Sequence, residues 1–223
     1  MKQNRNFMIL GVTGGAGSGK TTVVEQIEQM VPTVFLHCDV IAHQLMEPGG
    51  ASYKVLVEEF GEEILSEVPG GNMDKKRPIS RPKLSKVAMA TEATRKRLNE
   101  LTHPLVQREV EAELLRLTRE DYHGVVVIEA ALLIEAGYKS ICDSLWYVYA
   151  PIEDRIRRMK QKRGYSDEKI ANILAGQLSE AEFKANADVV IENPDRPKEE
   201  ALQELSEQIG ALLKDYVEST KKM

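Results

Sequence analysis

The sequence lacks three features that would each indicate a particular class of protein. It has only two cysteines in 223 residues, Cys38 and Cys142, which supply neither a disulfide framework nor a zinc site of the usual spacing. It has no excess of positive charge, because the formal net charge is −5, so no general basic field attracts nucleic acid. It has no long apolar run, because the apolar stretch near the N-terminus is well short of the roughly 20 residues that span a bilayer. We therefore expect neither nucleic acid nor a membrane as a partner.

Other absences bear on the cellular compartment and on the type of protein. The N-terminal region has no signal-peptide cleavage pattern, and two cysteines suit a reducing compartment, so we expect a cytoplasmic protein. Internal repeats and low-complexity segments are missing as well. With 42% hydrophobic and 29% charged residues, the composition is that of an ordinary globular protein that can bury a good core. We expect a monomer or a weak homo-oligomer.

The sequence does contain a glycine-rich phosphate-binding motif. Residues 14–21, GGAGSGKT, fit the P-loop pattern G-x-x-x-x-G-K-[ST]. The apolar run 7–12 before the motif is typical of a buried strand, and residues 22–30 after it repeat apolar side chains at helical spacing. A glycine turn without a ligand is the alternative, but four glycines, the Lys-Thr pair and the flanking strand argue against it. The expected nucleotide-binding residues here are Gly15, Ala16, Gly17, Ser18, Gly19, Lys20, Thr21 and Thr22.

Each residue type in this loop has a chemical task. Glycines let the chain turn sharply and bring backbone amides against phosphate oxygens. The start of the following helix adds unpaired N–H groups and partial positive charge. Lys20 supplies a mobile positive charge for the outer phosphates, and the Thr21 hydroxyl is the expected Mg²⁺ ligand. The motif alone therefore predicts a site for a nucleoside triphosphate.

The pattern along the rest of the chain predicts an α/β fold. Short apolar runs separated by helical patterns are typical of a parallel sheet flanked by helices, with ligands beyond the carboxyl ends of the strands. The five expected strands are 7–12, 33–36, 125–128, 145–149 and 188–191.

A long segment without sheet strands separates the second expected strand from the third. We expect residues 47–121 to form an inserted helical subdomain, with helices at roughly 81–101 and 104–121. The second of these helices would begin with Pro104 at its first position, where proline is tolerated. In a kinase, such an insertion is the place where the acceptor is recognised. The remaining core comprises residues 1–46 and 122–223, with a lid at about 153–183.

Two carboxylates follow expected strands on the ligand-binding edge. Asp39 comes just after strand 33–36, where a general base for a hydroxyl acceptor belongs. It can equally cap the helix Val40–Met46, and the residues alone favour the cap. Glu129 ends strand 125–128, where it can hold Mg²⁺ through water, or can serve as an N-cap or surface residue. The sequence leaves both choices open.

A cluster of basic residues follows the fourth expected strand. Arg155, Arg158 and Lys162 share one helix face by their spacing. A charge run is usually a solvated face, but a basic helix at this place in a P-loop protein can close over transferring phosphates and supply an arginine finger. Asn193, at the exit of the last expected strand, is positioned to contact the adenine.

The chain resembles the dephospho-coenzyme A kinases over nearly its whole length. The P-loop by itself is unspecific, but the segment 39–43, the pair His103-Pro104 and the Leu-Leu-x-Glu segment 132–135 are more characteristic. The resemblance extends through segments 11–21, 39–43, 47–49, 60–61, 103–105, 132–137, 177 and 187–193.

The resemblance implies a P-loop kinase-like fold with a nucleotide core, a helical acceptor domain and a lid. It implies transfer of the γ-phosphate of ATP, with Mg²⁺, to the ribose 3′-hydroxyl of dephospho-coenzyme A. On this basis Asp39 becomes the expected base, and Arg158 becomes the expected lid arginine, with Lys162 where a second arginine is usual. The acceptor-binding residues that it implies are Asp39, His103, Leu133, Glu135 and Arg81.

The sequence departs from the family pattern at several positions. His37-Cys38-Asp39 stands where the family has Asp-Ala-Asp, Glu129 replaces an aspartate, and Ala131 replaces a proline. The loop 71–79 is longer than usual, and Ser80-Arg81 replaces an acid-Arg pair. The alternatives are another small-metabolite or nucleoside kinase and a non-catalytic nucleotide-sensing relative. The nucleotide-sensing relative ranks lowest, below a GTPase-type switch. The D-x-x-G match at 121–124 argues against a switch, because it precedes a strand instead of following one.

Overall fold

The structure is a computed structural model in which the chain forms two compact units. The first unit comprises Met1–Leu36 and Leu117–Met223, and the second comprises His37–Arg116. The second unit therefore begins before the expected boundary at residue 47. The structure describes residues 5–67, 77–130, 133–134, 136–195 and 198–220.

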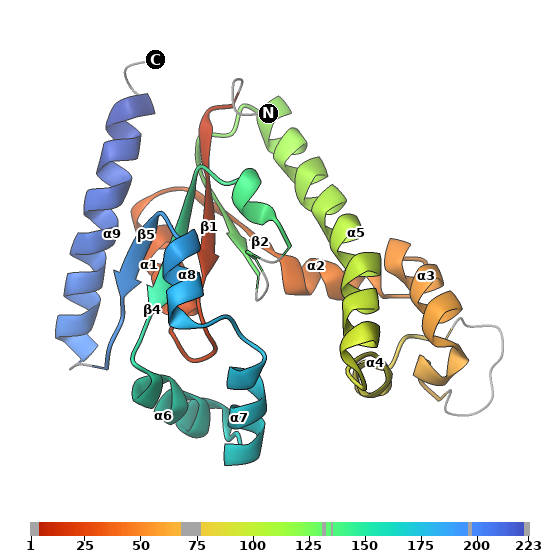
Figure 1. Cartoon of the computed structure of the whole chain (residues 1–223). Coiled ribbons are helices and arrows are strands. Elements are labelled where there is room, and N and C mark those ends of the chain that lie inside the picture. Colours follow the sequence, from red (N-terminus) through yellow and green to blue (C-terminus); the bar gives the residue numbers. More distant parts are fainter. Residues whose placement is uncertain (1–4, 68–76, 131–132, 135, 196–197, 221–223) are drawn as a thin grey trace. The chain divides into compact units, whose positions relative to one another are not determined.

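The first unit is built on a five-stranded sheet within the described residues (Figure 1). The strand order is β2-β3-β1-β4-β5, and the pairs β1–β3, β1–β4 and β4–β5 are parallel. All seven residues of the central strand β1 are buried, because strands pair along both of its edges and helices cover both faces of the sheet. The strands are β1 (Phe7–Thr13), β2 (Thr33–His37), β3 (Gly124–Glu129), β4 (Ser144–Tyr149) and β5 (Val189–Glu192).

Helices cover both faces of this sheet. On one face, α1 (Lys20–Met30) and α9 (Lys198–Thr220) bury residues such as Ile27 and Ile209 against Trp146 of β4. On the other face, the rings of Phe183 in α8 (Glu180–Asn186) and Tyr147 stack with centroids 4.9 Å apart. Trp146 and Tyr147 point to opposite faces because successive side chains of a β-strand alternate between the two faces of the sheet.

Two further helices of the first unit follow β4. Helix α6 spans Ile152–Arg163 and α7 spans Asp167–Ala175. Ser166 caps α7, because its hydroxyl accepts a hydrogen bond from the Lys169 amide, as its capping sequence predicts. A short 3₁₀ turn, η2 (Tyr138–Ser140), lies between β3 and β4.

The second unit is helical and has its own core. Leu56, Phe60 and Leu84 are among the buried residues that pack this core. An isolated antiparallel bridge pairs Leu65, just after η1, with Ile79, just before α4. Its elements are α2 (Cys38–Leu45), α3 (Ala51–Phe60), η1 (Glu62–Ile64), α4 (Arg81–Ala88) and α5 (Glu92–Arg119), the last of which continues into the first unit.

The expected strands are all present, but the helices of the insertion differ from the prediction. The segment expected as one helix at 81–101 is divided between α4 and α5. Pro104 does not begin a helix, because it lies inside the continuous α5. A proline removes one intrahelical hydrogen bond, but α5 buries Val106 and Val110 on one side, and such packing outweighs local propensity. Within the described residues, no helix is long and apolar enough to cross a membrane.

Candidate functional site

The predicted phosphate-binding loop lies at the centre of the sheet, between the end of β1 and the start of α1. Gly19 is the N-cap of α1 and has a left-handed backbone (φ 91°, ψ 29°), which favours glycine. Gly14 approaches the neighbouring strand closely, because a Cβ there would lie 2.5 Å from the carbonyl oxygen of Val148. The loop therefore requires glycine both for its turn and for its packing.

The side chains of this loop have distinct surroundings. The ammonium group of Lys20 reaches back across the loop and donates to the carbonyl of Gly14 at 2.8 Å. Thr21 is exposed and Thr22 is half-buried in the first turn of α1. The hydroxyl of Ser18 is buried and has no hydrogen-bond partner among the described residues. The loop thus presents a cationic group and a helix N-terminus at the end of β1.

Asn193 packs against the same loop from the end of β5. Its side-chain amide donates to the carbonyl of Ser18 at 2.8 Å, while its backbone amide donates to Tyr149. A Cβ on Gly19 would overlap the Asn193 side chain, which is a second reason why position 19 requires glycine. The structure therefore brings Asn193 to the loop, and its contact with the adenine stays a prediction.

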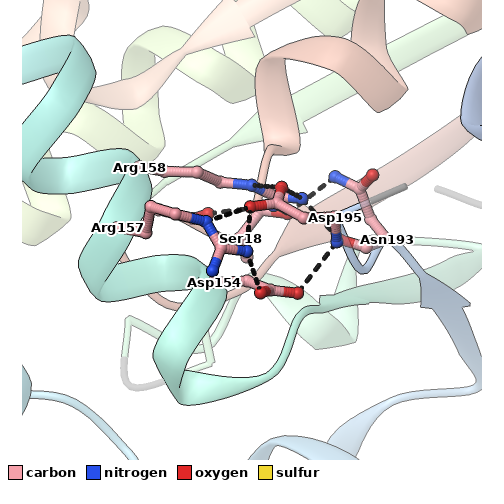
Figure 2. Close-up of polar contacts among 7 residues, drawn as sticks. Ser18, Asp154, Arg157, Arg158, Asn193 and Asp195 are labelled. Atoms are coloured by element: carbon pink, nitrogen blue, oxygen red, sulfur yellow. Dashed lines mark hydrogen bonds and ion pairs between the residues drawn. The ribbon is translucent and has the colours of Figure 1, made fainter. Parts of the chain in front are cut away.

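Arg158 of α6 holds the second half of the loop in place (Figure 2). Its Nη1 atom donates to the carbonyls of Gly17 at 3.1 Å and Ser18 at 3.0 Å. Its Nη2 atom donates to the Asn193 carbonyl at 2.8 Å, and its Nε atom donates to the Asp195 carboxylate at 2.7 Å. In this structure the guanidinium thus binds protein oxygens, and its predicted role as a lid arginine stays a prediction.

Asp195 connects Arg158 to a second arginine of the same helix. Arg157 donates to Asp195 and also to Asp154, which in turn accepts from the backbone amide of Asp195 at 2.8 Å (Figure 2). Burial acts to raise the pKa of Asp195, but the hydrogen bonds from Arg157 and Arg158 outweigh it and lower that pKa below its usual value. The Asp154–Arg157–Arg158–Asp195 network therefore ties the start of α6 to the loop that follows β5.

A further pair, Arg155 and Gln177, lies over the first half of the loop and was missed by the sequence-based predictions. The Gln177 side-chain oxygen accepts from the Ala16 amide at 3.2 Å and from Arg155 Nη2 at 2.7 Å. Arg155 Nε donates to the Ala16 carbonyl at 3.0 Å. The available signal was the shared helix face of Arg155 and Arg158, which places both side chains on the side that meets the loop.

The residues predicted to hold Mg²⁺ lie in the first unit near the loop. Glu129 ends β3 and is paired in register with Val12 of β1, which leads into the loop. Thr21 follows Lys20 directly in α1. A hydroxyl and a carboxylate are hard oxygen donors of the type that Mg²⁺ takes alongside phosphate oxygens. These two residues therefore fit a bound magnesium ion.

The predicted acceptor residues occupy different places in the fold. Asp39 is exposed in the first turn of α2, and because His37 is the N-cap of that helix, Asp39 is not the cap. Arg81 is exposed at the start of α4, and His103 is half-buried in α5. Burial lowers the pKa of His103, which favours its neutral form. Leu133 is completely buried and packs near Gly11 of β1. Glu135 and residues 71–76 lie outside the described residues.

His43 and Arg81 form a local electrostatic group with Asp39 in the second unit. Burial lowers the pKa of His43, the Arg81 charge lowers it further, and Asp39 acts in the opposite direction. A carboxylate and a guanidinium therefore both act on the His43 imidazole.

Comparison with known proteins identifies the family. The sequence model of the dephospho-CoA kinases matches residues 8–199, which include the whole P-loop, Asp39, Arg158 and Asn193. The chain belongs to the dephospho-CoA kinase family. The dephospho-CoA kinase of Geobacter sulfurreducens is 36% identical over 191 residues, which cover 86% of this chain and 92% of that protein.

Solved structures support the same fold. A crystal structure of a protein from Thermus thermophilus matches with a TM-score of 0.73 and 28% identity, covering 94% of this chain and 99% of that one. The dephospho-CoA kinase from Campylobacter jejuni matches with a TM-score of 0.64 at 21% identity, over 94% and 99% of the two chains. The predicted P-loop α/β fold of a dephospho-CoA kinase family member is therefore confirmed.

The D-x-x-G match at 121–124 has a structural explanation. Asp121 has a positive φ of 52° in the turn between α5 and β3, and its carboxylate accepts from the Asn6 side chain at 2.8 Å. Gly124 is the first residue of β3. The segment is a connecting turn before a strand, so it does not supply a GTPase switch.

Proposed function

We propose that this chain transfers the γ-phosphate of ATP to the ribose 3′-hydroxyl of dephospho-coenzyme A, giving coenzyme A and ADP. The observation that carries the proposal is the P-loop between β1 and α1 in a chain whose residues 8–199 match the dephospho-CoA kinases. The curated relatives that carry this name match most of the chain, which supports the same acceptor.

The nucleotide binds through the loop itself. Backbone amides of Gly15–Gly19 and the N-terminus of α1 supply donors to the phosphate oxygens, and Lys20 adds a mobile charge at the outer phosphates. The carbonyl of Gly14 holds Lys20 across the loop until the nucleotide arrives. Asn193 lies beside the loop and is the proposed contact of the nucleoside part.

Thr21 and Glu129 are the residues that would hold Mg²⁺, which, when bound, neutralises charge on the outer phosphates. The position of Glu129 beside Val12 supports this assignment.

Asp39 is the proposed general base. The 3′-hydroxyl oxygen forms a bond to the γ-phosphorus, the bond from that phosphorus to the β–γ bridging oxygen breaks, and the hydroxyl proton passes to the Asp39 carboxylate. Asp39 is exposed just beyond the end of β2, which supports access by an acceptor. Arg158 contributes positive charge beside the loop while it holds Gly17 and Ser18 in place.

The second unit is the proposed acceptor subdomain. Arg81 is exposed and supplies a guanidinium for the pyrophosphate of dephospho-coenzyme A. His103 is the other residue of this unit proposed to shape the site. Leu133 belongs to the first unit and is fully buried there, so it is not proposed as a direct acceptor contact. Glu135 stays a proposal from the family resemblance alone. His103 would act as an uncharged hydrogen-bonding group, because burial lowers its pKa.

The test is coenzyme A formation by the purified chain with ATP, compared across a panel of acceptors that includes dephospho-coenzyme A, adenosine and shikimate. We expect phosphorylation of dephospho-coenzyme A to exceed that of the other acceptors by orders of magnitude in kcat/KM. Lys20→Ala serves as the inactive control. A preference for another hydroxyl compound would assign the chain to a different acceptor, and ATP binding without any product would show a nucleotide-sensing protein.

A further inference from the structure

We propose that Arg155 and Gln177 form a latch on the phosphate-binding loop, that ATP displaces Gln177, and that Arg155 then pairs with the outermost phosphate. The inference rests on the proposed function only in taking ATP as the ligand of the loop. It assigns Gln177 as a competitor for a phosphate-binding amide and Arg155 as a nucleotide-binding residue.

The first observation is the place of the Gln177 side-chain oxygen. It accepts one hydrogen bond from the backbone amide of Ala16 at 3.2 Å and one from Arg155 Nη2 at 2.7 Å. A loop amide and a guanidinium are the donors that bind a phosphate oxygen in a P-loop protein. The amide oxygen of Gln177 therefore lies where a phosphate oxygen would accept, and the two cannot share the Ala16 amide.

The second observation is the contact between α6 and the glycines of the loop. A Cβ on Gly15 would overlap the Arg155 guanidinium, so this group lies directly against the Gly15 backbone. A Cβ on Gly17 would lie 2.6 Å from the Arg155 carbonyl, in a residue whose φ is 80°. Glycine at both positions thus lets the guanidinium and the helix backbone approach the surface that receives phosphate.

The third observation is that Arg155 has no acidic partner among the described residues. Its hydrogen bonds go to the carbonyl of Ala16 and the amide oxygen of Gln177, and in the described parts of the chain it forms no ion pair. Burial lowers the pKa of Arg155, which is the effect of removing a cation from water, and nearby Tyr147 and Glu180 only oppose it. An anionic phosphate would supply the full charge that these neutral oxygens lack.

Arg158 provides an internal comparison. Its Nε atom binds the Asp195 carboxylate, and its other donors bind three carbonyl oxygens, so it already has a complete set of partners. Arg155 is therefore the arginine of α6 that gains most from a phosphate.

The position of Lys20 indicates which phosphate Arg155 meets. Lys20 Nζ lies on the Gly14 carbonyl, next to Gly15, and a P-loop lysine reaches the outer phosphates. Arg155 covers Gly15 and bonds to Ala16, so it lies at the same end of the loop. We therefore assign it to the outermost phosphate of a triphosphate.

The experiment measures dissociation constants by calorimetry without any acceptor, using ATP, ADP and inorganic triphosphate at one fixed Mg²⁺ concentration. Gln177→Ala removes the competing oxygen, so ATP and inorganic triphosphate no longer have to break the hydrogen bond between Gln177 and the Ala16 amide. Both should therefore bind about 2- to 10-fold more tightly, which corresponds to the net free energy of one hydrogen bond. Arg155→Gln should weaken ATP and inorganic triphosphate about tenfold or more, and ADP less. Arg155→Lys should recover part of the loss.

The matched control is Arg163→Gln, which removes one positive charge from the exposed end of the same helix, where Arg163 lies over Tyr165. It should leave all three dissociation constants near those of the wild-type chain. Fluorescence of Trp146, the buried tryptophan of the same unit, verifies that each variant is folded.

Several results would overturn the proposal. Weaker or unchanged ATP binding by Gln177→Ala would show that Gln177 is no competitor. If Arg155→Gln and Arg163→Gln changed the dissociation constants equally, the effect of Arg155 would be one of general charge only. If Arg155→Gln weakened ATP and ADP binding equally, Arg155 would not bind the outermost phosphate. Because no acceptor is present, these results are independent of whether the chain forms coenzyme A.

Discussion

Replacement of Arg158 by methionine should destabilise the first unit, because this residue connects α6, the P-loop and the segment after β5. The variant keeps an unbranched side chain but loses the donors to the carbonyls of Gly17, Ser18 and Asn193 and to the Asp195 carboxylate. The side chain of Arg158 is 15% exposed and that of Asp195 is 35% exposed, so solvent compensates part of the loss.

The expected cost follows from the bonds that are lost. A hydrogen bond to a charged group contributes about 1.5–3 kcal/mol when it is well buried, but these bonds share one donor group and the freed carbonyls can hydrate. We therefore expect a loss of about 2–4 kcal/mol in unfolding free energy. For a chain of this size, that corresponds to a decrease of about 4–16 °C in the unfolding midpoint.

Trp146 makes the measurement specific to the unit that contains Arg158. It is the only tryptophan of the chain and is 1% exposed in the core formed by the sheet, α1 and α9. Its fluorescence during heating or urea unfolding therefore reports on this unit. Arg157→Met is the control, because Arg157 is 45% exposed and its ion pairs lie at the surface, where solvent weakens them. An Arg158→Met midpoint equal to that of Arg157→Met would refute the reasoning.

Three further predictions test other parts of the site. Asp39→Asn should lower kcat about 10²–10⁴-fold in a coenzyme A formation assay while the calorimetric dissociation constant for ATP is kept; near-normal transfer would remove Asp39 as the base. Gly19→Ala should cost about 1–2 kcal/mol for the left-handed backbone alone and should also weaken ATP binding, because its Cβ would overlap Asn193; unchanged unfolding and binding would contradict this. For His103→Gln, the difference in unfolding free energy from wild type should become smaller as the pH falls from 7 through 6.5. Urea titrations followed by circular dichroism measure this difference. Burial lowers the folded pKa of His103 below 6.5, so the unfolded wild-type chain binds the proton first; parallel pH profiles would contradict this sign.

The sheet and the loop were predictable because their signals are local. The apolar run before the loop is a central strand buried on both faces, and such strands are continuous hydrophobic runs. The G-x-x-x-x-G-K-[ST] spacing encodes a backbone shape that depends little on the rest of the chain, and the structure shows the left-handed Gly19 that this shape needs.

The helices of the insertion were less predictable because tertiary packing overrides local signals. Pro104 is typical of a helix start, but α5 passes through it, with Leu98 and Leu101 partly buried before it and Val106 and Val110 buried after it. Likewise, Asp39 resembles an N-cap, but the structure begins α2 at Cys38, directly after β2 ends at His37. A carboxylate in the first turn still interacts favourably with the helix dipole, so the local sequence is compatible with Asp39 either as the N-cap or as a first-turn residue.

The contacts of Arg155 and Gln177 could not be predicted from the sequence, because they join parts of the chain that are far apart. Spacing puts Arg155 and Arg158 on one helix face, but it does not show which half of the loop each one meets. That assignment depends on where α6 crosses the loop and on where the connection between α7 and α8 brings Gln177.

The decisive measurement for the proposed reaction is the position of the transferred phosphate. The purified chain is incubated with ATP labelled in the γ-phosphate and dephospho-coenzyme A, and the product is digested with a 3′-nucleotidase, which removes ribose 3′-phosphates. We predict that the label becomes covalently attached to the product and is released as phosphate from the ribose 3′-position, and that Lys20→Ala yields none. Label found only as free phosphate before digestion, or attached at another position, would contradict the proposed transfer.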